Sequence, residues 1–136
     1  IDFFGEKFVF MTDLGEVPEA AMEYCRMADH LIIESNFDLD MLIRGSYAPE
    51  LKKRIYEGNG HLSNDQCAHA LKMVLHKDLK SVYLCHLSEN NNSPKLAYDC
   101  ASEAITSMGY SLGTDVKLFC LPRREPSPLF TFEERQ

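Results

Sequence analysis

The sequence Leu31-Ile32-Ile33-Glu34-Ser35-Asn36 is an apolar run that ends in a carboxylate and two polar residues. A short apolar run between polar residues is typical of a strand buried in a parallel sheet. Two other runs have the same form: residues 8–11 end at Thr12-Asp13, and residues 81–85 end at His86. A fourth apolar run, residues 117–121, precedes a proline. The sequence therefore predicts about four strands.

Helical patterns fill the connections between these strands. Ser63 is a favourable N-cap, and Cys67, Leu71 and Val74 recur behind it at helical spacing. We expect helices over residues 18–28, 38–42, 50–56, 64–75 and 94–108. The buried side of the last one should carry Ala97, Cys100, Ala101, Ala104 and Met108. Because parallel strands need crossover connections, this alternation predicts an α/β fold with helices flanking a largely parallel sheet.

Sheets of this kind bind ligands at the carboxyl ends of their strands. Asp13, Glu34 and His86 each follow a predicted strand, and His61 lies in the turn before a helix. A carboxylate and an imidazole brought together suit zinc or manganese, so Asp13 and His86 are the candidate metal ligands. The structural alternatives are a turn residue before Gly15 for Asp13, and a buried, hydrogen-bonded histidine for His86.

Glu34 and His61 are the candidate catalytic residues. An unpaired carboxylate is costly to bury, so Glu34 needs a partner such as His61 or a metal. A histidine exchanges protons near neutral pH, so His61 could protonate a leaving group. The alternatives are a solvated strand end and a loop histidine. We expect the four candidates to converge on one edge of the sheet, and His30, His69 and His76 to be structural or solvent-facing.

The composition limits the classes of function. The 136 residues suffice for one core, and the net charge of -7 disfavours nonspecific attraction to nucleic acid. No apolar run reaches the roughly 18 residues that span a bilayer, so we expect a cytoplasmic protein without a membrane partner. The five cysteines are widely spaced without a C-x-x-C pair, which favours reduced core thiols. We expect one domain over residues 1–122 and an extended tail over 123–136.

Four motifs follow one another along the chain: T-D-L-G at 12–15, A-D-H-L-I-I-E-S-N-F-D at 28–38, G-H-L-S-N at 60–64 and H-L-S-E-N-N at 86–91. Together they resemble the metallo-β-lactamase fold, and within it the YycJ-like (WalJ-like) exonuclease branch, a relative of the ribonuclease Z group. The resemblance implies one half of an αββα sandwich. It also implies two divalent metal ions, zinc or manganese, with Asp13 as the bridging ligand and His86 as the last histidine ligand. Glu34 and His61 would be the pair that assists proton transfer to the leaving group.

Two departures from the family pattern affect what this chain can do. Phe37 stands where many relatives have a histidine. The family's H-x-H-x-D-H signature and a further histidine ligand, which lie upstream of the residue matching Asp13, are missing, and the chain has no initiator Met. We therefore expect a C-terminal half that, alone, binds metal weakly or not at all and shows no nuclease activity.

The function expected from the resemblance is that of a metal-dependent phosphodiesterase, specifically a nuclease similar to a DNA exonuclease, with nucleic acid as its substrate. The intact protein would then be an enzyme. The alternatives are a non-catalytic α/β interaction module and a hydrolase of the same fold that acts on thioesters or small esters. We expect the partner to be the missing N-terminal half or a second copy of the chain. It should cover an apolar sheet face built from residues such as Phe8, Phe10, Ile32, Val82 or Leu84. Only one parity of each strand can point to that face, and the sequence leaves open which one.

Overall fold

The computed structural model describes residues 1–12, 18–57 and 61–122. Within these ranges five strands form one sheet whose spatial order, β1-β2-β3-β4-β5, is the order along the chain. The strands are β1 (Asp2–Phe3), β2 (Glu6–Met11), β3 (His30–Glu34), β4 (Ser81–Cys85) and β5 (Lys117–Cys120). The pairs from β2 to β5 are all parallel, and β1 pairs with β2 in the antiparallel sense. The α/β fold with four parallel strands is therefore confirmed.

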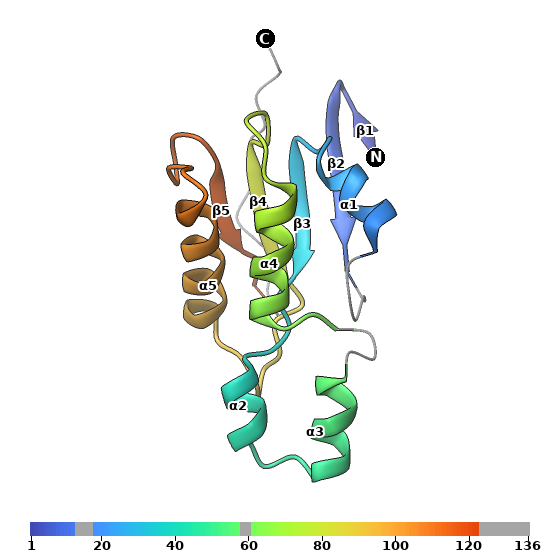
Figure 1. Ribbon diagram of the computed structural model, residues 1–136, viewed down its shortest axis with the longest axis vertical. Coiled ribbons are helices and arrows are strands. Elements are labelled where there is room, and N and C mark those ends of the chain that lie inside the picture. Colours follow the sequence, from blue (N-terminus) through green and yellow to red (C-terminus); the bar gives the residue numbers. More distant parts are fainter. Residues whose placement is uncertain (13–17, 58–60, 123–136) are drawn as a thin grey trace.

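The described helices are α1 (Glu19–Cys25), α2 (Leu39–Arg44), α3 (Pro49–Tyr56), α4 (Asn64–Val74) and α5 (Pro94–Ser107). Figure 1 shows α1, α4 and α5 against one face of the sheet, with α4 between the other two. The short helices α2 and α3 lie beyond the carboxyl ends of the parallel strands (Figure 1). This end of the sheet is where the sequence predicts the functional site. None of the helices in the described ranges is long and apolar enough to cross a membrane.

The core lies between the sheet and the three helices. Strand register aligns two apolar rows across the sheet on this face, Val9–Leu31–Val82–Leu118 and Met11–Ile33–Leu84–Cys120. The predicted stripe of α4, formed by Cys67, Leu71 and Val74, packs against these rows. Because side chains alternate across a strand, one row of each strand faces the helices and the other faces away from them.

The opposite face carries Phe10, Ile32, Tyr83 and Phe119 in one row across the sheet. Tyr83 and Phe119 stack with their ring centroids 5.2 Å apart, while Phe10 remains 56% exposed. Of the residues named from sequence for an uncovered face, Phe8, Phe10 and Ile32 share this parity. Val82 and Leu84 were wrong candidates, because the register turns them toward the helices, where both are fully buried.

Three predicted details need correction. The strand β1 was not predicted; it forms a tight hairpin with β2 through Phe4 and Gly5, whose φ angles of 53° and 79° are both left-handed. The helix expected to reach Ala28 ends at Cys25, because the i to i−3 hydrogen bonds of Met27 and Ala28 turn the chain into β3. Met108 lies just past the end of α5 and is 48% exposed, so it does not belong to the buried stripe.

Candidate active site

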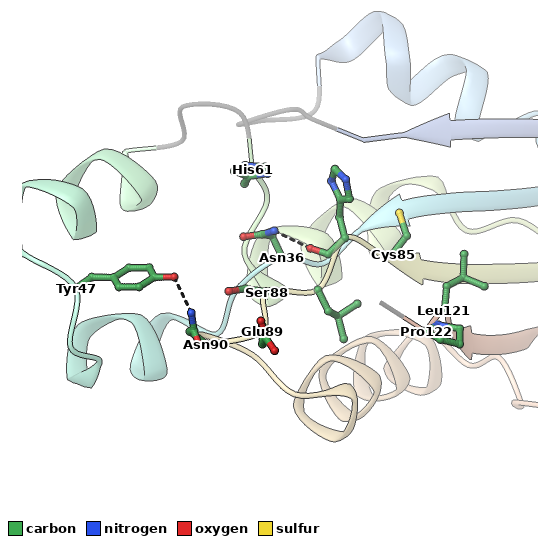
Figure 2. Close-up of a pocket in the computed structure, with 11 residues that line it drawn as sticks. Asn36, Tyr47, His61, Cys85, Ser88, Glu89, Asn90, Leu121 and Pro122 are labelled. Atoms are coloured by element: carbon green, nitrogen blue, oxygen red, sulfur yellow. Dashed lines mark hydrogen bonds between the residues drawn. The ribbon is translucent and has the colours of Figure 1, made fainter. Parts of the chain in front are cut away.

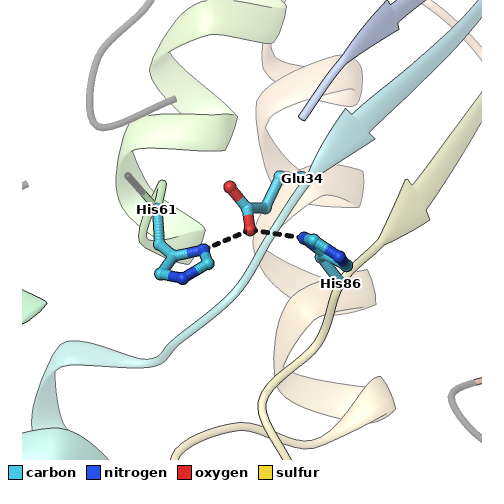
Figure 3. Close-up of side chains that lie close together, drawn as sticks. All are labelled: Glu34, His61 and His86. Atoms are coloured by element: carbon cyan, nitrogen blue, oxygen red, sulfur yellow. Dashed lines mark hydrogen bonds and ion pairs between the residues drawn. The ribbon is translucent and has the colours of Figure 1, made fainter. Parts of the chain in front are cut away.

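Three of the four predicted site residues lie together at the carboxyl end of the sheet. Glu34 is the last residue of β3, His86 directly follows β4, and His61 precedes α4. Figure 3 shows both imidazoles directed at one carboxylate. Glu34 Oε2 lies 2.7 Å from His61 Nδ1 and 3.0 Å from His86 Nδ1. The expected contact between Glu34 and His61 is therefore present, while the fourth candidate, Asp13, falls outside the described residues.

The carboxylate of Glu34 is buried behind the two rings. Its side chain is 0% exposed, whereas the side chains of His61 and His86 are 41% and 50% exposed. Its second oxygen, Oε1, accepts a hydrogen bond of 3.3 Å from the backbone nitrogen of Leu62. An ionised carboxylate can only accept, so both histidines donate through Nδ1. The contact fixes which ring nitrogen carries the proton and leaves each Nε2 as the atom for chemistry.

His86 occupies its position through an unfavourable backbone conformation. Its φ is 59°, in the left-handed region that non-glycine residues seldom adopt. The carbonyl of His86 accepts a 2.6 Å hydrogen bond from Asn36 Nδ2, and the Asn36 carbonyl accepts from the Ser88 nitrogen at 2.7 Å. Asn36 directly follows β3, so these two hydrogen bonds fix the loop after β4 to the loop after β3. Strained residues held by their surroundings in this way cluster at functional sites.

His61 is positioned by the start of α4. Ser63, the predicted N-cap, forms a capping box with Gln66, in which each side chain is bonded to the backbone of the other. The Leu62 carbonyl accepts from the Asn36 nitrogen, and the Asn64 nitrogen donates to the Phe37 carbonyl, both at 2.8 Å. The segment before α4 thus pairs with the segment after β3. This pairing brings the imidazole of His61 over the end of β3.

Asparagine side chains that the sequence analysis did not single out tie the site loops together. Asn64 and Asn92 are buried and bond to each other, and Asn92 Nδ2 also donates to the carbonyl of Ser35 at 2.9 Å. The run Asn90-Asn91-Asn92 is visible in the sequence, but a polar run of this kind predicts only a loop. Sequence gave no indication that Asn64, the first residue of a capped helix, would be buried.

A pocket opens beside the histidine pair. It has a volume of about 480 Å³, and both imidazoles are among the side chains that line it. Figure 2 shows Tyr47 and Asn90 further along it, joined by a hydrogen bond of 3.1 Å from Asn90 Nδ2 to the tyrosine hydroxyl. The histidines therefore face a space large enough for a small ligand.

The remaining histidines lie away from this pair. His30 is buried at the start of β3, where its Nδ1 lies 2.5 Å from Ser81 Oγ, and His69 is exposed on α4. His76 reaches the Ala28 carbonyl through Nε2 at 2.9 Å. Phe37, which stands in place of the histidine of many relatives, is 2% exposed and serves as a core residue.

All five cysteines are free thiols. Burial raises the pKa of Cys25 and of Cys120 to about 11, and it raises the pKa of Cys67 further. Burial, together with the Asp65 carboxylate, raises the pKa of Cys100 to about 11. These four thiols are protonated at neutral pH and make poor nucleophiles.

The donor set at the site fits a divalent metal. Among the described residues, Glu34, His61 and His86 each offer one ligand atom, and these atoms lie within 4.8 Å of one another. Carboxylate oxygen with imidazole nitrogen is a donor set that zinc and manganese both accept. The carboxylate behind His86 is also the arrangement that orients a histidine ligand toward a metal.

Sequence comparison relates the chain to proteins named as exodeoxyribonucleases. No family model matches the chain. The chain is 36% identical over 124 residues to "Exodeoxyribonuclease WalJ" of Streptococcus pneumoniae, which covers 91% of this chain and 46% of that protein. It is 34% identical over 107 residues to "Exodeoxyribonuclease YycJ" of Bacillus anthracis, covering 79% of this chain and 40% of that one. The chain thus spans about half the length of the curated relatives it matches.

A solved structure shares the fold. The crystal structure of a new diphosphatase from the PhnP family superposes with a TM-score of 0.51 at 15% sequence identity, covering 94% of this chain and 36% of that chain. The fold is that of the metallo-β-lactamase class. Together with the exodeoxyribonuclease relatives, it supports a metallo-β-lactamase-like hydrolase.

Proposed function

We propose that this chain supplies part of the active site of a metal-dependent phosphodiesterase that hydrolyses DNA. The observation that carries the proposal is the single buried carboxylate of Glu34, which accepts from Nδ1 of both His61 and His86 at the open end of the sheet. The names of the two relatives favour DNA as the substrate. The pocket beside the histidines, which Glu89 lines with one carboxylate, is better suited to a nucleotide than the acidic chain as a whole.

Each candidate residue has a separate role in the proposal. Asp13 and His86 are the residues that would hold metal. A bound divalent ion would polarise the scissile phosphate and favour ionisation of an attacking water. His61 acts as the proton donor: its Nε2 proton passes to the leaving oxygen, and the ring remains as the neutral form protonated at Nδ1. Glu34 stabilises the charged ring before transfer and holds the tautomer afterwards, as carboxylates paired with catalytic histidines do.

The proposed activity depends on ligands beyond those in this sequence. The chain contains no H-x-H-x-D-H motif, and two ligand residues leave a metal ion mostly hydrated. We propose that the isolated chain binds divalent metal weakly and does not cleave DNA. A polypeptide carrying that motif would pack on the sheet face opposite α1, α4 and α5, where Phe10 is half exposed.

The test is complementation. The chain is assayed alone, and with a polypeptide that carries the H-x-H-x-D-H segment, for manganese- and zinc-dependent hydrolysis of linear DNA and of bis(p-nitrophenyl) phosphate. We expect activity only in the complemented sample. His86→Ala should abolish it, while His69→Ala, at an exposed position on α4, should leave it unchanged.

Two results would overturn parts of the proposal. Complemented protein without metal-dependent hydrolysis of either substrate would exclude the phosphodiesterase assignment. Robust cleavage by the chain alone, lost on Asp13→Ala, would show that the site is complete within these 136 residues. Sedimentation of the chain alone tests the partner: a dimer would make a second copy of the chain the partner.

A further inference from the structure

The pocket beside the histidine pair is lined by more than one kind of group. The imidazoles of His61 and His86 line it together with neutral hydrogen-bonding groups from Tyr47, Ser88 and Asn90. Figure 2 shows Tyr47 and Asn90 to one side of His61. Among the described residues that line the pocket there is neither lysine nor arginine, and Glu89 adds a carboxylate. The part beside Tyr47 and Asn90 therefore favours a planar, uncharged ligand with hydrogen-bonding edges over a phosphate group.

We propose that this pocket binds the base and sugar of a single nucleotide whose phosphate lies against His61 and His86. The inference rests on the proposed phosphodiesterase function and names the part of the substrate that the pocket recognises. The volume of about 480 Å³ lies within the range of small-molecule sites. It accommodates one nucleoside unit beside the histidines.

Tyr47 and Asn90 are the residues that we assign to the base. The aromatic ring of Tyr47 offers a surface on which any base can stack. Its hydroxyl accepts from Asn90 Nδ2 at 3.1 Å, which leaves Asn90 one amide hydrogen and the carbonyl oxygen. An asparagine amide presents the donor and acceptor pair that matches the edge of a base.

The backbone holds these two residues next to each other. Tyr47 lies between α2 and α3, and Asn90 lies in the loop after β4 (Figure 2). The Asp38 nitrogen donates to the Asn91 carbonyl at 2.7 Å, which joins the start of α2 to that loop. At the other end of α2, a Cβ on Gly45 would lie 3.2 Å from Asn91 Oδ1, so a glycine allows the close approach there. The pocket is thus held by contacts that exist without ligand.

The test measures binding in the absence of metal, so it does not depend on hydrolysis. Deoxynucleoside 5′-monophosphates and 2-deoxyribose 5-phosphate are titrated into the chain and followed by amide resonances in NMR spectra. We expect the nucleotides to bind roughly tenfold more tightly than the sugar phosphate, from stacking on one aromatic ring. Tyr47→Ala should remove this difference, and the matched variant Tyr56→Ala, at an exposed tyrosine of α3, should keep it.

Two further variants separate stacking from folding. Tyr47→Phe keeps the ring and should retain most of the preference for nucleotides. Asn90→Ala changes an exposed side chain, so the fold should persist while the preference decreases. Equal binding of nucleotide and sugar phosphate, or a preference that survives both Tyr47→Ala and Asn90→Ala, overturns the inference. If the complemented protein hydrolyses DNA but the chain binds nucleotide and sugar phosphate equally, the proposed function stands and the role of the pocket is wrong. If the chain prefers nucleotides but the complemented protein hydrolyses neither substrate, the role of the pocket stands and the proposed function is wrong.

Discussion

Asn64 and Asn92 exchange two hydrogen bonds of 2.9 Å between their side-chain amides, although 28 residues separate them. Ser35 Oγ donates to Asn64 Oδ1 at 2.6 Å, and the Ser93 nitrogen donates to Asn92 Oδ1 at 2.9 Å. The pair joins the loop after β3, the first turn of α4 and the residue before the cap of α5. These are the segments that hold Glu34, His61 and His86 in place.

Replacing one amide of this pair should destabilise the whole fold. Asn92→Ala leaves the Asn64 amide and the Ser35 carbonyl buried without their partner, at a cost of about 2–3 kcal/mol. Asn90→Ala removes an exposed side chain and should cost less than about 0.5 kcal/mol. Urea unfolding of the two variants measures the difference, and equal midpoints would show that the amide pair contributes no stability.

The buried carboxylate of Glu34 should set the tautomers of both histidines. In the native chain we expect His61 and His86 to carry hydrogen on Nδ1, which long-range ¹H–¹⁵N correlation spectra report directly. In Glu34→Gln the amide oxygen can accept from both rings only when the amide NH2 faces the Leu62 nitrogen, which is itself a donor. When the amide turns the other way, its NH2 faces the two rings, and at least one ring should then change tautomer or leave its position.

The matched control for this substitution is Glu103→Gln, at an exposed position on α5. It makes the same chemical change without touching the histidines and should leave both ring spectra unaltered. Native-like tautomers in Glu34→Gln would mean that the negative charge of this carboxylate is not needed to orient the rings.

The left-handed backbone of His86 predicts an unusual order of stability. Glycine adopts a φ of 59° without strain, so His86→Gly should be more stable than His86→Ala by about 1 kcal/mol. At His69, inside α4, the order should reverse, because alanine is favoured over glycine in a helix by about 1 kcal/mol. Thermal or urea unfolding of the four variants decides this, and the same order at both positions would contradict the strain.

The buried His30 predicts a loss of stability in acid. Burial lowers the pKa of His30 below its ordinary value; the Glu6 carboxylate opposes this shift, and Lys80 adds to it. The ring stacks on Phe8 with centroids 4.7 Å apart, and Lys80 and Glu6 form an ion pair beside it. The folded chain therefore binds the proton less readily than the unfolded chain does.

The sign of the pH effect follows from this difference. Below the ordinary pKa of histidine, the unfolded state takes up a proton that the folded state does not, so stability decreases as pH falls. We expect the urea midpoint to drop between neutral pH and about pH 5.5, a range where histidine titrates. The drop should be smaller in His30→Gln and unchanged in His69→Gln. A drop of the same size in all three proteins would remove His30 as its cause.

The local signals in the sequence predicted the elements of the fold well. Asp38, Ser63 and Ser93 each accept a hydrogen bond from the backbone of the helix they precede, as capping residues do. The predicted run 81–85 has the same first and last residues as β4, because polar residues on both sides limit its apolar stretch. Strand-end position also predicted that Glu34, His61 and His86 would meet.

What sequence could not supply was long-range geometry. The side of the sheet to which Val82 points depends on register, and register is set by pairing with distant strands. The buried amide pair depends on two loops meeting, and an asparagine in a polar run carries no sign of that. The role of Asp13 stays a prediction.

The agreement between strand order in the sheet and strand order in the chain has a consequence for how the protein is made. Each new strand of the parallel part can dock on an edge that earlier residues have already formed, so synthesis from the amino terminus never requires insertion between paired strands. The Glu34 carboxylate is then in place on β3 well before β4 delivers His86.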